Sequence, residues 1–221
     1  MNPQFGLIAY RLLLISEYWA LGTGYCLQMR LFVAIDLDPD IRERIARFSE
    51  GVRGLAPDVR WTAPEAMHIT LKFIGEVSED TLDRVKAQLE KVSAPPSNIQ
   101  FGGTGFFPTP RSARVFWAGI QPDSSLIALA EAVDRLMGAI GIPFEERSFT
   151  PHLTLARSGS GRRAREKADR ANNKFAKLQQ RLAKMPEADF GTMTAREFIL
   201  YQSKTSPKGA QYTKLARYEL K

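Results

Sequence analysis

Alternating apolar and polar residues recur along the chain in short runs that are typical of strands. Side chains of a strand point to opposite faces in turn, so such runs place one apolar face against a core. Between them, apolar residues return every three or four positions, as they do on one face of a helix. The chain therefore alternates strand and helix patterns. Strands are predicted over Leu31 to Leu37, Val59 to Ile74 (with a turn near Ala63-Pro64-Glu65), Ile99 to Phe107, Arg114 to Ile120, Phe149 to Arg157, Arg196 to Ser203, and Tyr212 to Leu220.

Three helices are predicted between these strands. The first begins at Asp38-Pro39, since proline is tolerated in a first turn, and Ser78 is a plausible N-cap of the second. The pattern predicts an α+β fold with two pseudo-symmetric antiparallel-sheet lobes, helices packed outside and a central cleft. The positions expected to face the core are Ile41, Ile45, Phe48 and Val52, then Leu82, Val85, Leu89 and Val92, then Leu126, Leu129, Val133, Leu136 and Ile140.

The two lobes are expected because the sequence contains a repeat. His68-Ile69-Thr70-Leu71 and His152-Leu153-Thr154-Leu155 share one pattern and stand 84 residues apart. The same offset aligns Leu31-Phe32-Val33-Ala34 with Val115-Phe116-Trp117-Ala118, so that Phe and Ala coincide. Two copies at so long a spacing indicate paired lobes and not a solenoid.

Each repeat presents an imidazole and a hydroxyl on one face of a strand. His and Thr at positions i and i+2 point the same way, and the apolar residues between them point into a core. These are the only two histidines of the chain. Two imidazoles that face one cleft can serve as general acid and general base near neutral pH, and two hydroxyls can hold an anion between them.

Composition favours an anionic partner and argues against several classes of site. The net charge is +7, and the stretch from Arg157 to Lys184 has ten Lys/Arg residues against two acidic ones. Apolar residues at helical spacing in this stretch predict a basic helix over 162–184, which is either a solvated face or a surface for nucleic-acid phosphates. With one cysteine, Cys26, and two histidines, neither a disulfide framework nor a Cys/His zinc cluster is expected. A cytoplasmic, metal-independent protein is the expectation.

Residues 1–28 stand apart from the globular pattern. Leu12-Leu13-Leu14-Ile15 is too short to span a bilayer, and Glu17 interrupts it. The regular pattern begins at Met29. Residues 1–28 are therefore interpreted as an extension or a misassigned start, a secretory leader being the alternative, and residues 29–221 as the two-lobed domain.

With its flanking residues, the doubled motif resembles the two-histidine phosphoesterase superfamily. Within it, the chain is most similar to the bacterial RNA 2′,3′-cyclic phosphodiesterases, which are also called 2′-5′ RNA ligases. The resemblance covers Met29 to Lys221, while the leading segment has no counterpart and Arg162 to Asn173 is longer and more basic than usual. The matching runs are His68 to Gly75, Thr150 to Arg157, Arg30 to Ile35, Val115 to Gly119, and the tail from Ser203 through Gly209 to Tyr212.

The resemblance implies hydrolysis of a 2′,3′-cyclic phosphate at an RNA end to a 2′-phosphate, without metal or cofactor. By position, His68 is the expected proton donor to the departing 3′ oxygen and His152 the base that activates water. Thr70 and Thr154 are expected to bind the phosphate oxygens, together with Arg157.

Aromatic residues near the motifs allow two interpretations. Phe73 is expected on the same strand face as His68 and Thr70, where it either stacks on a base or packs at the rim. Tyr212 is placed there by the resemblance alone, and Trp61 and Trp117 are expected in the core.

Other activities remain open at this point. A ligase or a phosphodiesterase acting on 2′-5′ linkages uses the same two imidazoles. A non-catalytic RNA-binding module is the alternative from another class, although a pure binder has little use for paired imidazoles. No membrane association is expected, and a monomer is the default.

Overall fold

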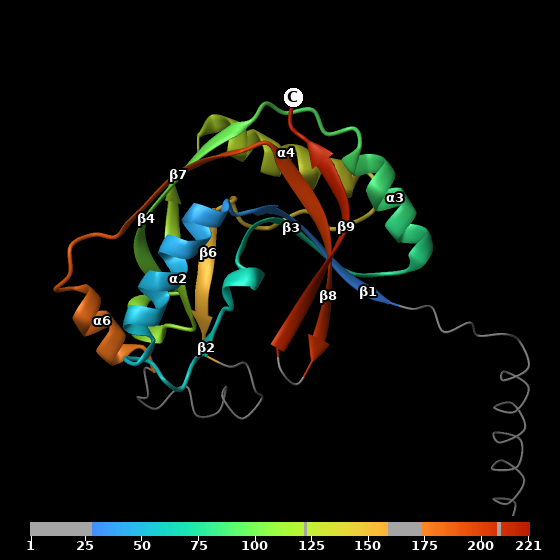
Figure 1. Cartoon of the computed structure of the whole chain (residues 1–221). Helices are drawn as coiled ribbons and strands as arrows, with labels where there is room; N and C mark the ends of the chain where they lie inside the picture. The colour runs from blue at the N-terminus through green and yellow to red at the C-terminus, as the bar shows by residue number, and fades with distance from the viewer. Residues whose placement is uncertain (1–27, 122, 159–173, 207–208) are drawn as a thin grey trace, which may run out of the picture.

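Two antiparallel sheets with helices on their outer sides make up the protein (Figure 1). The computed structural model describes residues 28–121, 123–158, 174–206 and 209–221. The strands are β1 (Met29–Asp36), β2 (Arg60–Trp61), β3 (His68–Val77), β4 (Ser97–Phe107), β5 (Val115–Gln121), β6 (His152–Arg157), β7 (Asp189–Ala195), β8 (Glu197–Ser206) and β9 (Gly209–Glu219). The helices are α2 (Pro39–Arg53), α3 (Glu79–Leu89), α4 (Ser124–Gly138) and α6 (Ala176–Leu182), with 3₁₀ turns η1 (Pro64–Ala66) and η2 (Pro110–Ser112).

Each sheet contains one copy of the repeat. The first has the order β3-β1-β8-β9 and the second β2-β6-β5-β4-β7. In the first, β1 pairs with β3, and in the second, β5 pairs with β6 in the same antiparallel way. Both histidine strands therefore lie beside the strand that precedes them in their own repeat, and the predicted α+β fold of two related lobes is confirmed.

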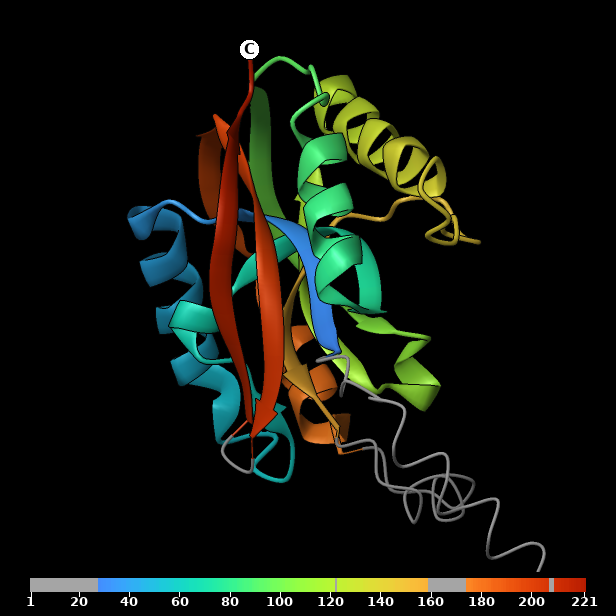
Figure 2. The same ribbon diagram turned by 90° about the vertical axis from the view of Figure 1, so that its right-hand side faces the viewer.

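The helices cover the sheets from outside. Helix α4 packs on β3 and on α3, whereas α2 contacts β7 of the other sheet. Figure 2 shows α2 on one side of the β8–β9 hairpin and α3 with α4 on the other. Ser78 caps α3 as predicted, because its side chain accepts a hydrogen bond from the Thr81 amide. Strand β7 was not predicted, since the Gly191 within it weakens the strand pattern.

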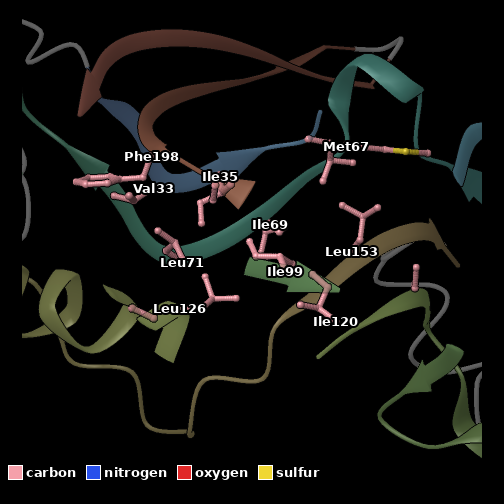
Figure 3. Packing of buried hydrophobic residues seen from close by; sticks show 14 of the residues in the cluster. Val33, Ile35, Met67, Ile69, Leu71, Ile99, Ile120, Leu126, Leu153 and Phe198 are labelled. Carbon is pink, nitrogen blue, oxygen red and sulfur yellow. The ribbon is translucent and has the colours of Figure 1, made fainter. Parts of the chain in front are cut away.

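One hydrophobic core joins the two lobes. Ile69 and Leu71 from β3 lie in the same buried cluster as Leu153 and Leu155 from β6. Figure 3 shows Ile69 and Leu153 pointing into this shared core. The apolar half of each motif is thus buried as predicted, which leaves the His/Thr half to face the other way.

A β-bulge follows the threonine in both motif strands. Ala34 is opposite Thr70 and Val33 is opposite Lys72, so Leu71 is the extra residue of β3. In β6 the extra residue is Leu155, because Trp117 and Phe116 are opposite Thr154 and Ala156. A bulge shifts the alternation of faces by one residue. The fifth residue after each histidine therefore turns to the His/Thr face.

Phe73 and Arg157 are the residues that the two bulges redirect. Strict alternation would place Lys72 and Ala156 beside the motif, but both are buried on the core side. Phe73 is instead 61% exposed, and its ring lies 6.4 Å from that of Phe32, which contacts His68. The expectation that Phe73 shares the face of His68 is confirmed, and the bulge is its physical cause.

The strand pairing also corrects one part of the repeat. The sequence offset matches Phe32 with Phe116 and Ala34 with Ala118. In the structure, Ala34 and Trp117 hold equivalent places opposite the two threonines, one residue out of step with that match. Phe32 consequently faces the site, whereas Phe116 lies in the main core.

Two predictions concern residues that the structure describes only in part. Residues 1–27, which make up all but the last residue of the predicted extension, lie outside the described residues. The predicted basic helix over 162–184 lies outside them up to residue 173, and its remainder contains α6, with Phe175 and Leu178 buried. Within the described part of the chain, no helix has the length and apolarity needed to span a membrane.

Candidate active site

Both histidine rings are held in the same way by the backbone two residues earlier. Nδ1 of His68 lies 2.8 Å from the Ala66 carbonyl, and Nδ1 of His152 lies 2.9 Å from the Thr150 carbonyl. A carbonyl oxygen only accepts, so in each ring Nδ1 donates its proton. Nε2 is then the free position that is able to take or give a proton. The fixed tautomer is what acid–base chemistry at Nε2 requires.

Aromatic rings surround His68. The ring of Phe32 lies 4.8 Å away, and Tyr212 meets the imidazole edge-on at 5.1 Å. The ring of Tyr201 stacks on that of Phe32, and the two ring centroids lie 5.1 Å apart. Tyr212, which was placed by resemblance alone, therefore does contact the first histidine, although β9 is far from it in sequence.

Burial favours the neutral form of both imidazoles. It lowers the pKa of His68 to about 4, against smaller opposing effects of the Ala66 carbonyl and the Asp36 carboxylate. Burial also lowers the pKa of His152, and the nearby charge of Arg157 acts in the same direction. In the absence of an anion, both rings are therefore neutral at pH 7.

The positive charge of Arg157 acts on ionisable groups of both lobes. Its Nη2 donates to Thr154 Oγ1 at 3.2 Å, which joins two of the predicted phosphate ligands. Its positive charge lowers the pKa of His68 and of Tyr212 in the first sheet as well as that of His152. Strands β3 and β6 also contact each other. The structure thus brings the two motifs and Tyr212 together around Arg157.

Sequence reasoning missed the groups that support each histidine. Asp36, at the end of β1, lies opposite His68 and accepts hydrogen bonds from Tyr201 and Lys214. The ring of Phe107 meets His152 edge-on at 5.0 Å. Only the three-dimensional fold brings β8 and β9 beside β1, so no local pattern marks these residues.

Trp117 corrects a prediction. The ring was expected in the core, but Trp117 lies opposite Thr154 on the site face and packs on Phe107 at 5.1 Å. A Cβ on Gly105 would come within 2.1 Å of the indole, so the glycine makes room for it. Trp61, by contrast, packs against the core as expected and meets Phe116 edge-on.

No described residues form a metal-binding group of three or more His, Cys, Asp or Glu side chains. The predicted site consists instead of imidazoles, hydroxyls, a guanidinium and aromatic rings.

A family model described as LigT-like phosphoesterase matches residues 35–117 and 119–212 of the chain. The chain belongs to the LigT-like phosphoesterase family. Among its curated relatives is the RNA 2′,3′-cyclic phosphodiesterase of Archaeoglobus fulgidus, 36% identical over 86% of this chain and 100% of that protein. The protein of the same name from Methanothermobacter thermautotrophicus is 30% identical over 88% of this chain and 100% of its own length.

Solved LigT-like structures share the fold. The crystal structure of E. coli LigT complexed with 3′-AMP superposes with a TM-score of 0.69 at 29% identity, covering 87% of this chain and 98% of that one. A Thermus thermophilus protein, TT0787, gives a TM-score of 0.68 at 27% identity over the same shares. The two-histidine resemblance drawn from the doubled motif is thereby confirmed.

Proposed function

We propose that the protein is an RNA 2′,3′-cyclic phosphodiesterase that hydrolyses the cyclic phosphate at an RNA end to a 2′-phosphomonoester. The observation that supports this function best is the equivalent anchoring of two imidazoles, each with Nδ1 on a backbone carbonyl and Nε2 free. The curated relatives of the same name extend over most of the chain, which agrees with this chemistry.

The reaction needs one base and one acid. Nε2 of His152 takes a proton from water as the water oxygen bonds to phosphorus. The bond between phosphorus and the 3′ oxygen breaks, and Nε2 of His68 donates a proton to that oxygen. The products are a 2′-phosphate and a 3′-hydroxyl, and one proton has passed from His68 to product while His152 has gained one. Exchange with solvent then restores both rings.

The negative charge of the substrate enables His68 to take up, from solvent, the proton that it lacks in the unliganded protein. In the unliganded protein, burial lowers the pKa of this ring to about 4, so it is neutral at pH 7. A phosphodiester anion placed beside the ring favours the charged form and raises the pKa. Substrate binding and proton uptake by His68 are therefore coupled.

Three donors would stabilise the phosphoryl oxygens. The hydroxyls of Thr70 and Thr154 lie on the same strand faces as the histidines, and Arg157 already donates to Thr154. Hydrogen bonds from a guanidinium to phosphate oxygens are charge-assisted and strong. The exposed ring of Phe73 and the partly exposed ring of Tyr212 then offer surfaces for stacking of the terminal base.

A defined RNA with a 2′,3′-cyclic phosphate end tests the proposal. Incubation in buffer with EDTA should give a 2′-phosphate, identified by ³¹P NMR and by its resistance to a 3′-specific phosphatase, and H152Q should give none. A 3′-phosphate product would refute the assigned leaving group. Joining to an added RNA with a 5′-hydroxyl would indicate a ligase, and retention without product would indicate a binding module.

We also propose that the working unit is a monomer of residues 29–221 in the cytoplasm. Strand β1 begins at Met29, and the single cysteine of the chain suits a reducing compartment. A chain that starts at Met29 should retain the full rate on the cyclic-ended RNA and elute as a monomer. Loss of activity on removal of residues 1–28 would contradict this domain assignment.

A further inference from the structure

The two halves of the site differ at the position opposite each histidine. In the first sheet, Asp36 of β1 is the residue opposite His68. In the second, the equivalent residue opposite His152 is Gly119 of β5. At this cross-strand position the otherwise repeated arrangement has a carboxylate in the first sheet and no side chain in the second.

Asp36 is held in place and kept ionised. Its Oδ1 accepts from the Tyr201 hydroxyl and its Oδ2 from the Lys214 ammonium, so side chains from β8 and β9 fix both oxygens. Burial alone would raise the pKa of this carboxyl, but the hydrogen bonds from Lys214 and Tyr201 outweigh it and lower the pKa. Asp36 is therefore a fixed negative charge at neutral pH.

The second half has no room for an equivalent carboxylate. A Cβ built on Gly119 would lie 2.3 Å from the Gly102 carbonyl oxygen, which belongs to the neighbouring strand β4. Backbone atoms do not yield as a flexible side chain does, so any larger residue at 119 would distort the sheet. The asymmetry is thus part of the packing of the second sheet.

We propose that Asp36, fixed by Tyr201 and Lys214, is the positioning residue that makes His68 the proton-holding member of the pair. It rests on the proposed function, in which His68 is the acid. Asp36 acts through its charge on the imidazole and does not itself touch the reacting atoms. Asp36 thereby determines that His68 is the imidazole that donates a proton and His152 the one that accepts one.

The charges that face each ring support this difference. Asp36 favours protonated His68, while Arg157 and Arg42 oppose it. Tyr201 and Tyr212 stay neutral, because burial raises the pKa of each phenol.

Of these charges, only that of Arg157 shifts the pKa of His152. A bound phosphate offsets the charge of Arg157 at both rings. The Asp36 carboxylate, whose effect on His68 exceeds that of Arg42, then favours a proton on His68 and has no counterpart at His152.

Because the chain has only two histidines, each imidazole is visible separately by NMR. The ¹³Cε1 shifts of both rings are titrated with pH in the full-length protein, with and without saturating inorganic phosphate, and H152Q assigns them. With phosphate, the pKa of both rings should rise, and the effect of Asp36 on His68 should persist. D36N should lower the pKa of His68 in both conditions and leave His152 in place. K214Q removes the half-exposed ammonium that partly neutralises the Asp36 carboxylate. K214Q should therefore raise the pKa of His68.

The pH dependence of kcat on the cyclic-ended RNA gives a second reading. The rate falls at high pH as the acid loses its proton, and one unit of pKa changes the protonated fraction about tenfold in that range. D36N should move this limb to lower pH and K214Q should move it to higher pH, with convergence of both on the wild-type rate at low pH. A general loss of structure would lower the rate at every pH.

Two outcomes would overturn the proposal. One is a His68 titration that is unchanged in both single variants, K214Q and D36N. Should D36N fail to fold, an unchanged His68 titration in K214Q has the same meaning. The other is an equal shift of the pKa of both histidines in D36N. If the titrations behave as described but no 2′-phosphate forms, the proposed function fails while the electrostatic role of Asp36 stands.

Discussion

Lys72 is the one buried charged residue among those that the structure describes, and it provides a sharp test of the packing between the lobes. Its side chain is 2% exposed, and Nζ lies 2.6 Å from Asp134 Oδ1 of α4 and 2.6 Å from the Pro143 carbonyl. Glu145 lies farther, at 3.6 Å. The segment that contains Pro143 and Glu145 leads from α4 to β6. Lys72 therefore links the first histidine strand, β3, to the segment that precedes the second histidine strand.

Removing the anion should cost more stability than removing the cation. D134N leaves an ammonium buried with only the Pro143 carbonyl and the half-exposed Glu145, which should cost about 3 kcal/mol, the low end for a broken buried pair. K72M leaves Asp134 24% exposed and Pro143 exposed, so both can bind water, and the expected cost is about 1 kcal/mol. The matched control E145Q should cost under about 0.5 kcal/mol, since its partner is distant and the side chain is 48% exposed.

Urea unfolding followed by tryptophan fluorescence measures these free energies without the charge screening that guanidinium would add. The expected order of loss is D134N, then K72M, then E145Q. In the double variant K72M/D134N the loss should fall back toward that of K72M alone. If K72M costs as much as D134N or more, the stability of this region comes from the contacts of Lys72 and not from compensation of its charge, and the reasoning fails.

The remaining predictions concern the site. Replacing His68 or His152 by Ala should reduce turnover below detection, and wild-type pH–rate profiles should be bell-shaped; near-native turnover would remove that histidine from the mechanism. Thr70→Val or Thr154→Val should lower kcat less, by about a hundredfold to a thousandfold, as loss of one oxyanion donor does. Arg157→Lys should also lower kcat/KM, because the guanidinium fork is lost; an unchanged value would assign Arg157 a surface role. Since the folded pKa of His68 lies near 4 and the unfolded value near 6.5, stability should fall as pH drops from about 6.5 toward 4, and His68→Gln should flatten that fall in urea titrations.

The sequence was most informative where periodicity and repetition coincide. The doubled motif predicted two related lobes, the burial of Ile69 and Leu153, and the family, because alternation along a strand is a local property. The Ser78 cap follows from the same kind of local rule. For the motif residues themselves, the structure shows that Arg157 contacts Thr154 and acts electrostatically on both histidines, and their roles stay a proposal.

The remainder depends on contacts that are distant in the sequence. No pattern places β8 and β9 beside β1, so Tyr201, Lys214 and the role of Asp36 were not predicted. The place of Trp117 was wrong because Phe116, Ala118 and Ile120 of β5 face the core, which leaves Trp117 on the opposite face of the strand. The bulges at Leu71 and Leu155 were not predicted either, because neither extra residue is a glycine that would mark a bulge.

The paired bulges have a consequence for altering specificity. Each histidine strand presents one residue, Phe73 in the first sheet and Arg157 in the second, whose preceding neighbour is buried in the interior while its own side chain is exposed. These two positions, one aromatic and one cationic, are therefore places where the surface beside the motifs can be altered without repacking the interior. At position 73, where the ring is 61% exposed, a substitution offers a route to change base preference while Arg157 stays in place.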